Sequence, residues 1–291
     1  INKGDLNSKS SNVFINFKKF IDISNSLGLS GIEFPLFRFF NEFDNFELLT
    51  NYLKIKNKFI VLDSDKILDV EQIKKLINIA TKFNLNVIRV KTSSILSCDR
   101  KLIGMEWKNH LNLIIKKLKK LSTILIDNNI KIAIENHQDL NSDDILNIIN
   151  EVGSDVVGLN FDVGNSFATC ELPIDFLKKL SKYVLNVHIK DYILYKTKEG
   201  FLLSSCAIGK GNVNFVEIIN YLNKHCINTK LVIEIGALES RIIKYKNKDF
   251  WNFFVKNKTI QNNSFFHFFE KTANEMINYK PNPYEKNFTD V

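Results

Sequence analysis

Four short apolar runs of the sequence each end in, or carry, a side chain that can bind a metal ion. These side chains are Glu135 in 130–137, Asp162 in 156–162, His188 in 184–191 and Glu234 in 231–236. A charge at the end of a buried strand is costly unless it meets a partner, and a divalent cation is the usual partner of several converging carboxylates. A metal site therefore requires that the fold bring these four ends together.

Strand and helix patterns alternate along the chain. Apolar runs of strand length lie at 31–34, 58–62, 86–91, 130–135, 156–162, 184–190 and 231–235, and helical patterns lie at 13–21, 46–55, 70–83, 106–128, 143–152, 174–183 and 213–226. The chain starts with Ile, so we expect its natural N-terminus, and with it part of a first strand, to be missing. Counting that strand, the pattern predicts an α/β fold, a single-domain (β/α)8 TIM barrel over residues 1–291. A doubly wound sheet would need a Gly-rich phosphate loop after the first strand, and none is seen.

The barrel predicts which side chains face inward. Side chains alternate along a strand, so Ala133, Glu135 and His137 share one face, while Ile132 and Ile134 take the other. The same alternation predicts further inward side chains at Asn160, Asp162, Asn186, His188, Lys190 and Glu234. The candidate ligands would then meet at the C-terminal mouth of the barrel, where barrel enzymes keep their active sites.

Four motifs carry a resemblance to a known family. They are Ile-Glu-Asn-His at 134–137, Asn-Phe-Asp-Val-Gly-Asn at 160–165, Val-His-Ile-Lys-Asp at 187–191 and Ile-Glu at 233–234. In this order, they resemble the sugar phosphate isomerase/epimerase branch of the xylose isomerase-like TIM barrel family. The corresponding side chains of that family bind one divalent metal ion, so the resemblance implies four ligands, Glu135, Asp162, His188 and Glu234. Mixed oxygen and nitrogen ligands favour Mn²⁺, with Mg²⁺, Co²⁺ or Zn²⁺ as alternatives.

Two positions depart from the family pattern. Relatives that epimerise ketoses have a His three residues after the metal-binding Asp and an Arg six residues after the metal-binding His, and here these positions are Asn165 and Leu194. The endonuclease IV branch uses three zinc ions and extra histidines on earlier strands. The runs at 58–62 and 86–91 carry no histidine, which argues against such a DNA-repair site.

The resemblance and the ligand types together predict proton transfer next to a carbonyl group. A divalent cation grips vicinal oxygens and polarises a carbonyl, and Glu135 and Glu234 would remove and return the proton. We therefore expect an isomerase or epimerase that acts on a sugar, a sugar phosphate or a polyol-derived ketone. A dehydratase of the same fold, acting on an inosose or dehydroshikimate-like substrate, is the closest alternative, and a barrel that only binds a sugar or a partner is another.

Five further residues are candidates for substrate contacts: His137, Asn165, Lys190, Glu33 and Arg89. Each has a structural alternative, such as a hydrogen bond for the histidine or an internal ion pair for the charged side chains. The remaining histidines lie in helical or aromatic settings and are interpreted as structural; they are His110, His225 and His267.

Composition narrows the class of partner and the compartment. The formal net charge is +8, but the lysines are scattered over helical segments and are not interleaved with aromatic residues, so we expect no nucleic-acid partner. The four cysteines form no CxxC pair, which favours a reducing cytoplasm over a disulfide framework. No apolar run reaches the length of a membrane span.

Two segments lie outside the alternating pattern. Residues 191–211 are expected to form a lid-like hairpin over the barrel mouth, closed by Gly209-Lys210-Gly211, which would be either a phosphate-binding loop or a plain turn. Residues 240–291 are rich in Phe and are expected to form the last helices, and also a surface for a homo-oligomer.

Overall fold

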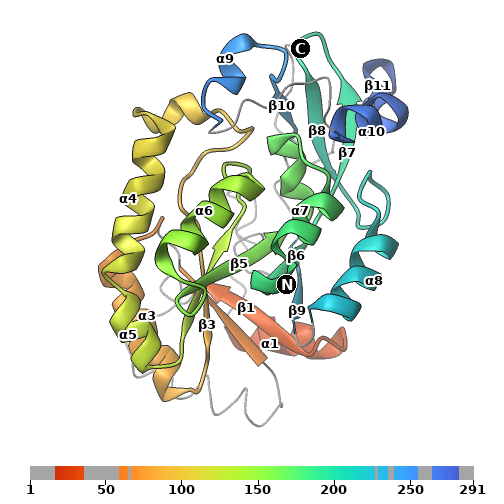
Figure 1. Cartoon of the computed structure of the whole chain (residues 1–291). Coiled ribbons are helices and arrows are strands. Elements are labelled where there is room, and N and C mark those ends of the chain that lie inside the picture. Colours follow the sequence, from red (N-terminus) through yellow and green to blue (C-terminus); the bar gives the residue numbers. More distant parts are fainter. Residues whose placement is uncertain are drawn as a thin grey trace.

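Seven parallel strands form the central sheet of the computed structural model, which describes residues 17–35, 59–64, 67–226, 229–234, 239–254 and 264–281. In sheet order they are β1 (Gly31–Pro35), β2 (Phe59–Asp63), β3 (Val87–Val90), β4 (Lys131–Glu135), β5 (Val157–Asp162), β6 (Val184–Ile189) and β9 (Lys230–Ile233). The sheet curves into a nearly closed barrel (Figure 1), which confirms the predicted fold class. The expected strand before β1 falls on residues outside those ranges.

Helices follow most of the strands and cover the outside of the sheet (Figure 1). They are α1 (Phe17–Ser26), α3 (Val70–Lys82), α4 (Trp107–Lys119), α5 (Ser122–Asp127), α6 (Ser142–Val152), α7 (Pro173–Leu180) and α8 (Phe215–His225). Side-chain caps stabilise the starts of α3 and α6: the Asp69 side chain accepts from the Gln72 N–H at 2.9 Å, and Asn141 forms a capping box with Asp144. The amphipathic stretch at 46–55 lies outside the part that the structure describes.

One predicted helix is in fact two. The pattern at 106–128 predicts a single long helix, but α4 ends at Lys119 and α5 starts at Ser122. The Ser122 hydroxyl donates to the Lys119 carbonyl oxygen at 2.8 Å, a local hydrogen bond that competes with the helical ladder. Apolar periodicity continues through the break because both helices pack on the same sheet face.

The predicted strand register is confirmed. Ile132 and Ile134 are fully buried in the hydrophobic core between sheet and helices. On the opposite face, the Asn186 Nδ2 donates to Asn160 Oδ1 at 2.6 Å and to Glu33 Oε2 at 2.9 Å. Because Asn186 and Glu33 lie on strands that are not neighbours in the sheet, this bond crosses the barrel interior.

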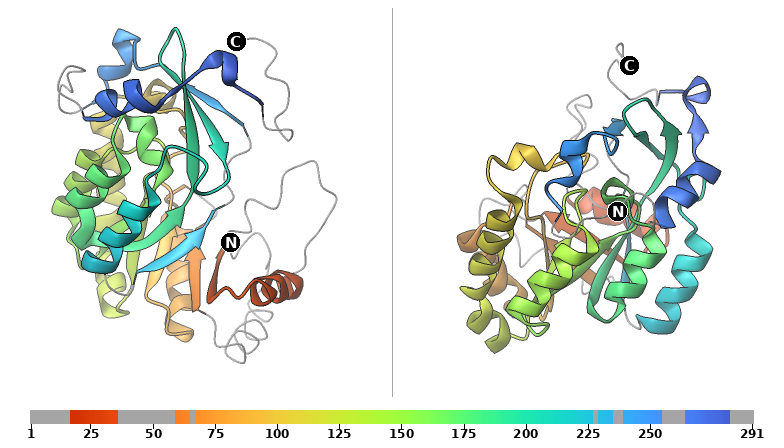
Figure 2. Two further views of the ribbon diagram at one scale, coloured as in Figure 1. Left: turned by 90° about the vertical axis from the view of Figure 1, so that its right-hand side faces the viewer. Right: turned by 45° about the horizontal axis from the view of Figure 1, so that its top comes forward.

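Residues 191–206 form the predicted hairpin, which is part of a second, four-stranded sheet. Its strands are β7 (Asp191–Lys196), β8 (Phe201–Cys206), β10 (Arg241–Ile243) and β11 (Asn274–Glu275), in the order β10-β8-β7-β11. This sheet projects beyond the C-terminal ends of the barrel strands (Figure 2). A Cβ at Gly200 would lie 1.9 Å from the Ile243 carbonyl oxygen, so the hairpin needs glycine there to approach β10. Movement of the hairpin as a lid stays a prediction.

Aromatic residues of the C-terminal segment pack against this hairpin. The segment contains α9 (Lys248–Trp251) and α10 (Ser264–Thr272), and Phe265 and Phe269 of α10 lie 5.4 and 5.3 Å from Phe201, ring centre to ring centre. Phe265 and Phe269 are at most 1% exposed, so their burial occurs within one chain. A homo-oligomer contact elsewhere on this segment stays a prediction. Among the described residues, no helix is long and apolar enough to cross a membrane.

Short 3₁₀ helices complete the connections: η3 (Arg100–Ile103), η4 (Gly164–Thr169), η5 (Ser181–Tyr183) and η7 (Met276–Asn278). The loop after β4 is held to the loop after β3 by Asp139, whose carboxylate accepts from the Ser93 hydroxyl at 2.5 Å and from the Leu140 N–H at 2.8 Å. Burial raises the pKa of Asp139 from its ordinary value of 3.8 to about 6, in spite of these hydrogen bonds.

The raised pKa of Asp139 predicts a pH-dependent stability. The folded chain holds this proton more tightly than the unfolded chain, so the stabilisation is present below about pH 4 and is lost as pH rises through 6. Asp139→Asn does not titrate, so the difference in unfolding free energy between this variant and the wild type should shift in favour of the variant by about 2 to 3 kcal/mol from pH 4 to pH 7. Urea unfolding at both pH values measures this difference, and a difference that does not change with pH would contradict it.

Candidate functional site

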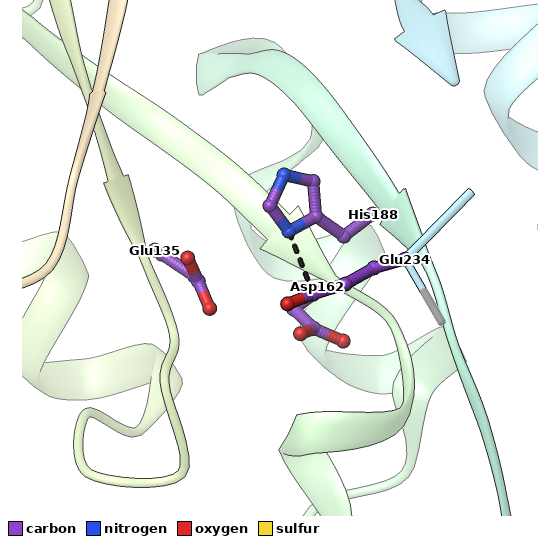
Figure 3. A group of neighbouring side chains, drawn as sticks. All are labelled: Glu135, Asp162, His188 and Glu234. Atoms are coloured by element: carbon purple, nitrogen blue, oxygen red, sulfur yellow. Dashed lines mark hydrogen bonds and ion pairs between the residues drawn. The ribbon is translucent and has the colours of Figure 1, made fainter. Parts of the chain in front are cut away.

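The four strand-end side chains of the sequence meet in space. Figure 3 shows the carboxylates of Glu135, Asp162 and Glu234 and the ring of His188 turned toward one another. Glu135 lies on β4, Asp162 on β5 and His188 on β6, and Glu234 directly follows β9. One ligand atom from each residue lies within 4.8 Å of the others. These four residues, here called the quartet, form the one group of metal-binding type found among the described residues.

Sheet register explains why the quartet forms. Glu135 pairs with Asn160 across β4 and β5, while Asp162 pairs with His188 across β5 and β6. Positions two residues apart on a strand point to the same face, so Glu135, Asp162 and His188 all face inward. The strands of the quartet are consecutive in the sheet, which brings their C-terminal ends to one part of the barrel mouth.

The residues present fit a divalent cation. Glu135 Oε1 and Asp162 Oδ1 are buried, and neither has a hydrogen-bond partner within the described structure. Buried carboxylate oxygens without donors are costly, and a cation between them would remove that cost. Three carboxylates and one imidazole are also the hard and borderline donors that Mn²⁺ and Mg²⁺ accept.

Two buried cations neutralise part of this acidic cluster. Arg89 on β3 pairs with Glu135, and also with Asp63 at the end of β2 at 2.5 Å. Lys190 follows β6 and bridges two quartet members, at 3.0 Å from Asp162 Oδ2 and 2.9 Å from Glu234 Oε2. With Glu33, five carboxylates share this interior with Arg89, Lys190 and His188. A divalent ion would therefore offset an excess of negative charge.

The two carboxylates that pair with Arg89, those of Glu135 and Asp63, have pKa values shifted in opposite directions. Burial acts to raise the pKa of Glu135, but the adjacent Arg89, together with His137 and His188, outweighs burial and holds the pKa at about 2, so this carboxylate is ionised at neutral pH. At Asp63 the balance is reversed, since burial outweighs Arg89 and raises the pKa to about 6. Arg89 thus favours the ionised form of the carboxylate that belongs to the quartet.

Asp162 is fixed through both its backbone and its side chain. Asn136 forms two hydrogen bonds with the Asp162 backbone: it accepts from the N–H at 2.8 Å and donates to the carbonyl oxygen at 2.9 Å. The Asn165 Nδ2 donates to the Asp162 carboxylate at 2.6 Å. Asn136 was not predicted as a site residue, although its position between Glu135 and His137 in the Glu-Asn-His motif could have indicated it.

A second set of hydrogen bonds reaches Asn165 from two loops. Gln138 Nε2 donates to Asn165 Oδ1 and contacts the Tyr192 hydroxyl, both at 3.2 Å, and the Tyr192 hydroxyl donates to Asn165 Oδ1 at 3.1 Å. Gln138 Oε1 accepts from the Ser97 N–H at 3.0 Å. The side chains of Gln138, Asn165 and Tyr192 are buried, and Ser97 contributes only its backbone N–H. The sequence contains no signal for Gln138 or Tyr192, because these contacts join loops that are far apart in the chain.

His137 lies beside the quartet and is half-buried. Burial lowers the pKa of His137 to about 3, against the opposing effect of Glu135, so its ring is neutral at pH 7. Its Nδ1 has no hydrogen-bond partner within the described ranges. A neutral imidazole next to the quartet, with a ring nitrogen that has no partner among the described residues, can donate or accept one hydrogen bond with a bound molecule.

The Gly209-Lys210-Gly211 turn is already occupied by a carboxylate of the chain. Asp191 Oδ2 accepts from the N–H groups of Gly209 and Gly211 at 2.9 and 2.8 Å. A Cβ at Gly211 would lie 2.3 Å from Asp191 Oδ1, so glycine is needed for this close approach. Of the two interpretations of this loop, the structure supports the plain turn, because Asp191 takes the amides that a phosphate would need.

The sequence matches the model of one known family over most of its length. The chain belongs to the xylose isomerase-like TIM barrel family, whose model matches residues 21–244. Curated relatives match shorter stretches. One is the uncharacterized protein YihM of Escherichia coli, 31% identical over 96 residues, which are 33% of this chain and 29% of the relative. Another is 3-oxo-isoapionate decarboxylase of Pectobacterium atrosepticum, 25% identical over 108 residues, 36% of this chain and 39% of the relative. The chain thus spans less than half of these relatives.

Solved structures share the fold over most of their length. The 3-keto-D-glucoside 4-epimerase YcjR of E. coli has a TM-score of 0.61 at 16% identity, covering 79% of this chain and 92% of that one. A Mycobacterium smegmatis xylose isomerase-like barrel in complex with magnesium has a TM-score of 0.60 at 19% identity, covering 76% of this chain and 81% of that one. The probable 3-DHS dehydratase AsbF of Bacillus anthracis has a TM-score of 0.56 at 18% identity, covering 77% of this chain and 88% of that one. At these identities the likeness shows the fold alone.

Proposed function

We propose that this chain is a divalent-metal-dependent isomerase or epimerase that moves a proton next to the carbonyl group of a sugar, a sugar phosphate or a polyol-derived ketone. The observation that carries the proposal is the buried convergence of Glu135, Asp162, His188 and Glu234 within 4.8 Å at the barrel mouth. The sugar epimerase among the neighbours supports the substrate class, and the magnesium-bound neighbour supports a hard divalent ion.

The quartet would hold one ion, with Mn²⁺ the preferred candidate and Mg²⁺, Co²⁺ or Zn²⁺ as alternatives. When bound, a divalent ion supplies Lewis acidity that polarises a carbonyl and acidifies the adjacent C–H. Glu135 on β4 and Glu234 after β9 lie three strands apart in the sheet, and each carboxylate has a second oxygen. One of them removes the proton from the substrate carbon and the other returns it.

Among the other candidates, we now assign two roles. His137 and Lys190 remain proposed substrate contacts, because His137 is half-buried with an Nδ1 that has no hydrogen-bond partner within the described residues, and Lys190 brings a positive charge beside Asp162 and Glu234. Glu33, Arg89 and Asn165 are buried and bonded to quartet residues, so we propose that they position the quartet and do not touch the substrate.

Solvent exchange tests the proposed reaction. Incubation of the Mn²⁺-loaded protein with a panel of ketoses, ketose phosphates and inososes in D₂O should place deuterium on the carbon next to the carbonyl of one substrate, without loss of water. Proton NMR detects the exchange, and mass spectrometry detects any loss of mass. Glu234→Gln should abolish net conversion of the substrate, because one of the two carboxylates that remove and return the proton is gone. Full conversion in Glu234→Gln would contradict this assignment.

A metal-dependent lyase, such as a dehydratase, is the second candidate. Two observations favour it. Asn165 replaces a histidine of ketose epimerases and is bonded to Asp162, and Leu194, in place of their arginine, is fully buried in the hydrophobic core. Both substrate-binding groups of those relatives are therefore missing here. In the D₂O experiment, loss of water from an inosose or dehydroshikimate-like substrate would replace the epimerase proposal by this one.

The DNA-repair alternative has little support from the site. The described strands β2 and β3 carry no histidine, and the quartet is the one candidate metal group in the described ranges. We therefore propose a small-molecule substrate and no nucleic-acid partner. A cytoplasmic location is also proposed, supported by four cysteines that are all free thiols.

A further inference from the structure

A contact across the barrel joins the proposed ligand His188 to Glu33. The Nε2 of His188 lies 2.9 Å from Glu33 Oε2 and 3.0 Å from Glu33 Oε1, and both side chains are fully buried. Glu33 lies on β1 and His188 on β6, which are not neighbours in the sheet. The contact is therefore made by the two side chains alone, across the interior of the barrel.

The two ring nitrogens of His188 face different carboxylates. Nδ1 lies 3.0 Å from Glu234, which belongs to the quartet, whereas Nε2 faces Glu33, which does not. A neutral imidazole has one N–H and one lone pair. If Nε2 carries the hydrogen and donates it to Glu33, the lone pair of Nδ1 points toward Asp162, Glu135 and Glu234.

Glu33 is itself held in place by the layer of side chains beneath the quartet. The Asn186 Nδ2 donates to Glu33 Oε2 at 2.9 Å, and the same nitrogen donates to Asn160 Oδ1 at 2.6 Å. The Arg89 Nε lies 4.0 Å from Glu33 Oε1. Because Glu33 is fixed by neighbours that are buried as well, it can fix the orientation of the His188 ring in turn.

We propose that Glu33 is a positioning residue that orients His188 and keeps its hydrogen on Nε2, so that Nδ1 is the atom that binds the divalent ion. This inference rests on the metal site of the proposed function and adds to it the ligand atom and the residue that selects it. Carboxylates that accept a hydrogen bond from a metal-binding histidine commonly fix its tautomer and strengthen the metal site.

Metal affinity tests this role without any substrate. Mn²⁺ titration of the full chain, followed by calorimetry, should give a dissociation constant about 10 to 100 times larger for Glu33→Gln than for the wild type. Asp63→Asn is the matched control, because it removes another buried carboxylate that pairs with Arg89 instead of His188. Equal losses in the two variants would mean that Glu33 acts only through the charge of the interior, and would overturn the inference.

A spectroscopic measurement on the wild type covers the case in which Glu33→Gln does not fold. Nitrogen-15 NMR of the Zn²⁺-loaded wild type should show His188 protonated at Nε2 and bound through Nδ1, and the opposite assignment would overturn the inference. A wild type that binds no divalent ion would overturn the proposed function and this inference together. A wild type that binds as tightly as Glu33→Gln would overturn the inference alone.

Discussion

His188→Ala is expected to lose both the bound divalent ion and turnover. The substitution removes the one nitrogen ligand of the quartet and leaves the three carboxylates with Arg89 and Lys190 as their only positive partners in the described interior. Loss of the Lewis acid should raise the barrier by about 4 kcal/mol, or about a thousandfold in rate. Metal analysis of the purified variant and the initial rate of the D₂O exchange reaction measure the two effects.

His110→Ala is the matched control for this prediction. His110 lies on α4, is 5% exposed, and contacts the Trp107 ring at 5.0 Å, so it is a buried histidine outside the quartet. Its replacement should leave metal content unchanged, whatever it does to stability. Full metal occupancy and full turnover in His188→Ala would contradict the metal assignment.

Arg100→Met is expected to destabilise the fold by about 3 to 5 kcal/mol, the usual cost of breaking a buried ion pair by removing one partner. The Arg100 side chain is fully buried and pairs with Asp144 at 2.6 Å. It also donates to the carbonyl oxygens of Asp139 and Phe253, and lies 4.2 Å from the ring centre of Trp107. Arg100 thus joins the loops above the barrel to the C-terminal segment, and its loss would leave these groups unpaired.

Lys101→Met provides the comparison for Arg100. Lys101 is the next residue and pairs with Asp249 at 2.6 Å, but both side chains are about half exposed. Exposed ion pairs contribute roughly 0 to 1 kcal/mol, so this variant should unfold close to the wild type. Thermal and urea unfolding of the two variants measure the difference. Similar stability in both would mean that the interior pairing of Arg100 contributes little.

Much of the fold could be predicted from local sequence. The strands β4, β5 and β6 are short, mainly apolar runs bounded by polar residues, and the structure places them within a residue or two of the expected limits. Their alternation also gave the inward faces correctly, because a one-residue slip would put Ile132 and Ile134 inside the barrel and Glu135 among the helices.

Pairings between distant segments could not be predicted in the same way. The hairpin of β7 and β8 was visible from its turn, but its sheet also contains β10 and β11 from the tail. Those strands are three and two residues long, which is too short for a periodic pattern. The break between α4 and α5 was missed for a related reason, since apolar spacing records which face is buried and not whether the backbone ladder is continuous.

In the candidate site, too, features set by local sequence could be predicted and contacts between distant segments could not. The quartet was visible because each member ends an apolar run or lies within one, and the four runs follow one another in the order of the family motifs. The surrounding groups were less visible, because the role of a buried polar residue depends on what lies opposite it. Asn165 illustrates this, since it was predicted as a substrate contact and its amide is bonded to Asp162. The net charge of +8 gave no indication of the acidic interior around Arg89.

The most direct measurement of the central claim is the number of divalent ions that one chain binds. Titration of the metal-free wild type with Mn²⁺, followed by electron paramagnetic resonance of the free ion, counts the bound ions. The quartet predicts saturation at one ion per chain in the wild type, and no saturable binding in His188→Ala. Absence of binding in the wild type, or binding of three ions per chain, would contradict the single-metal site on which the proposed proton transfer depends.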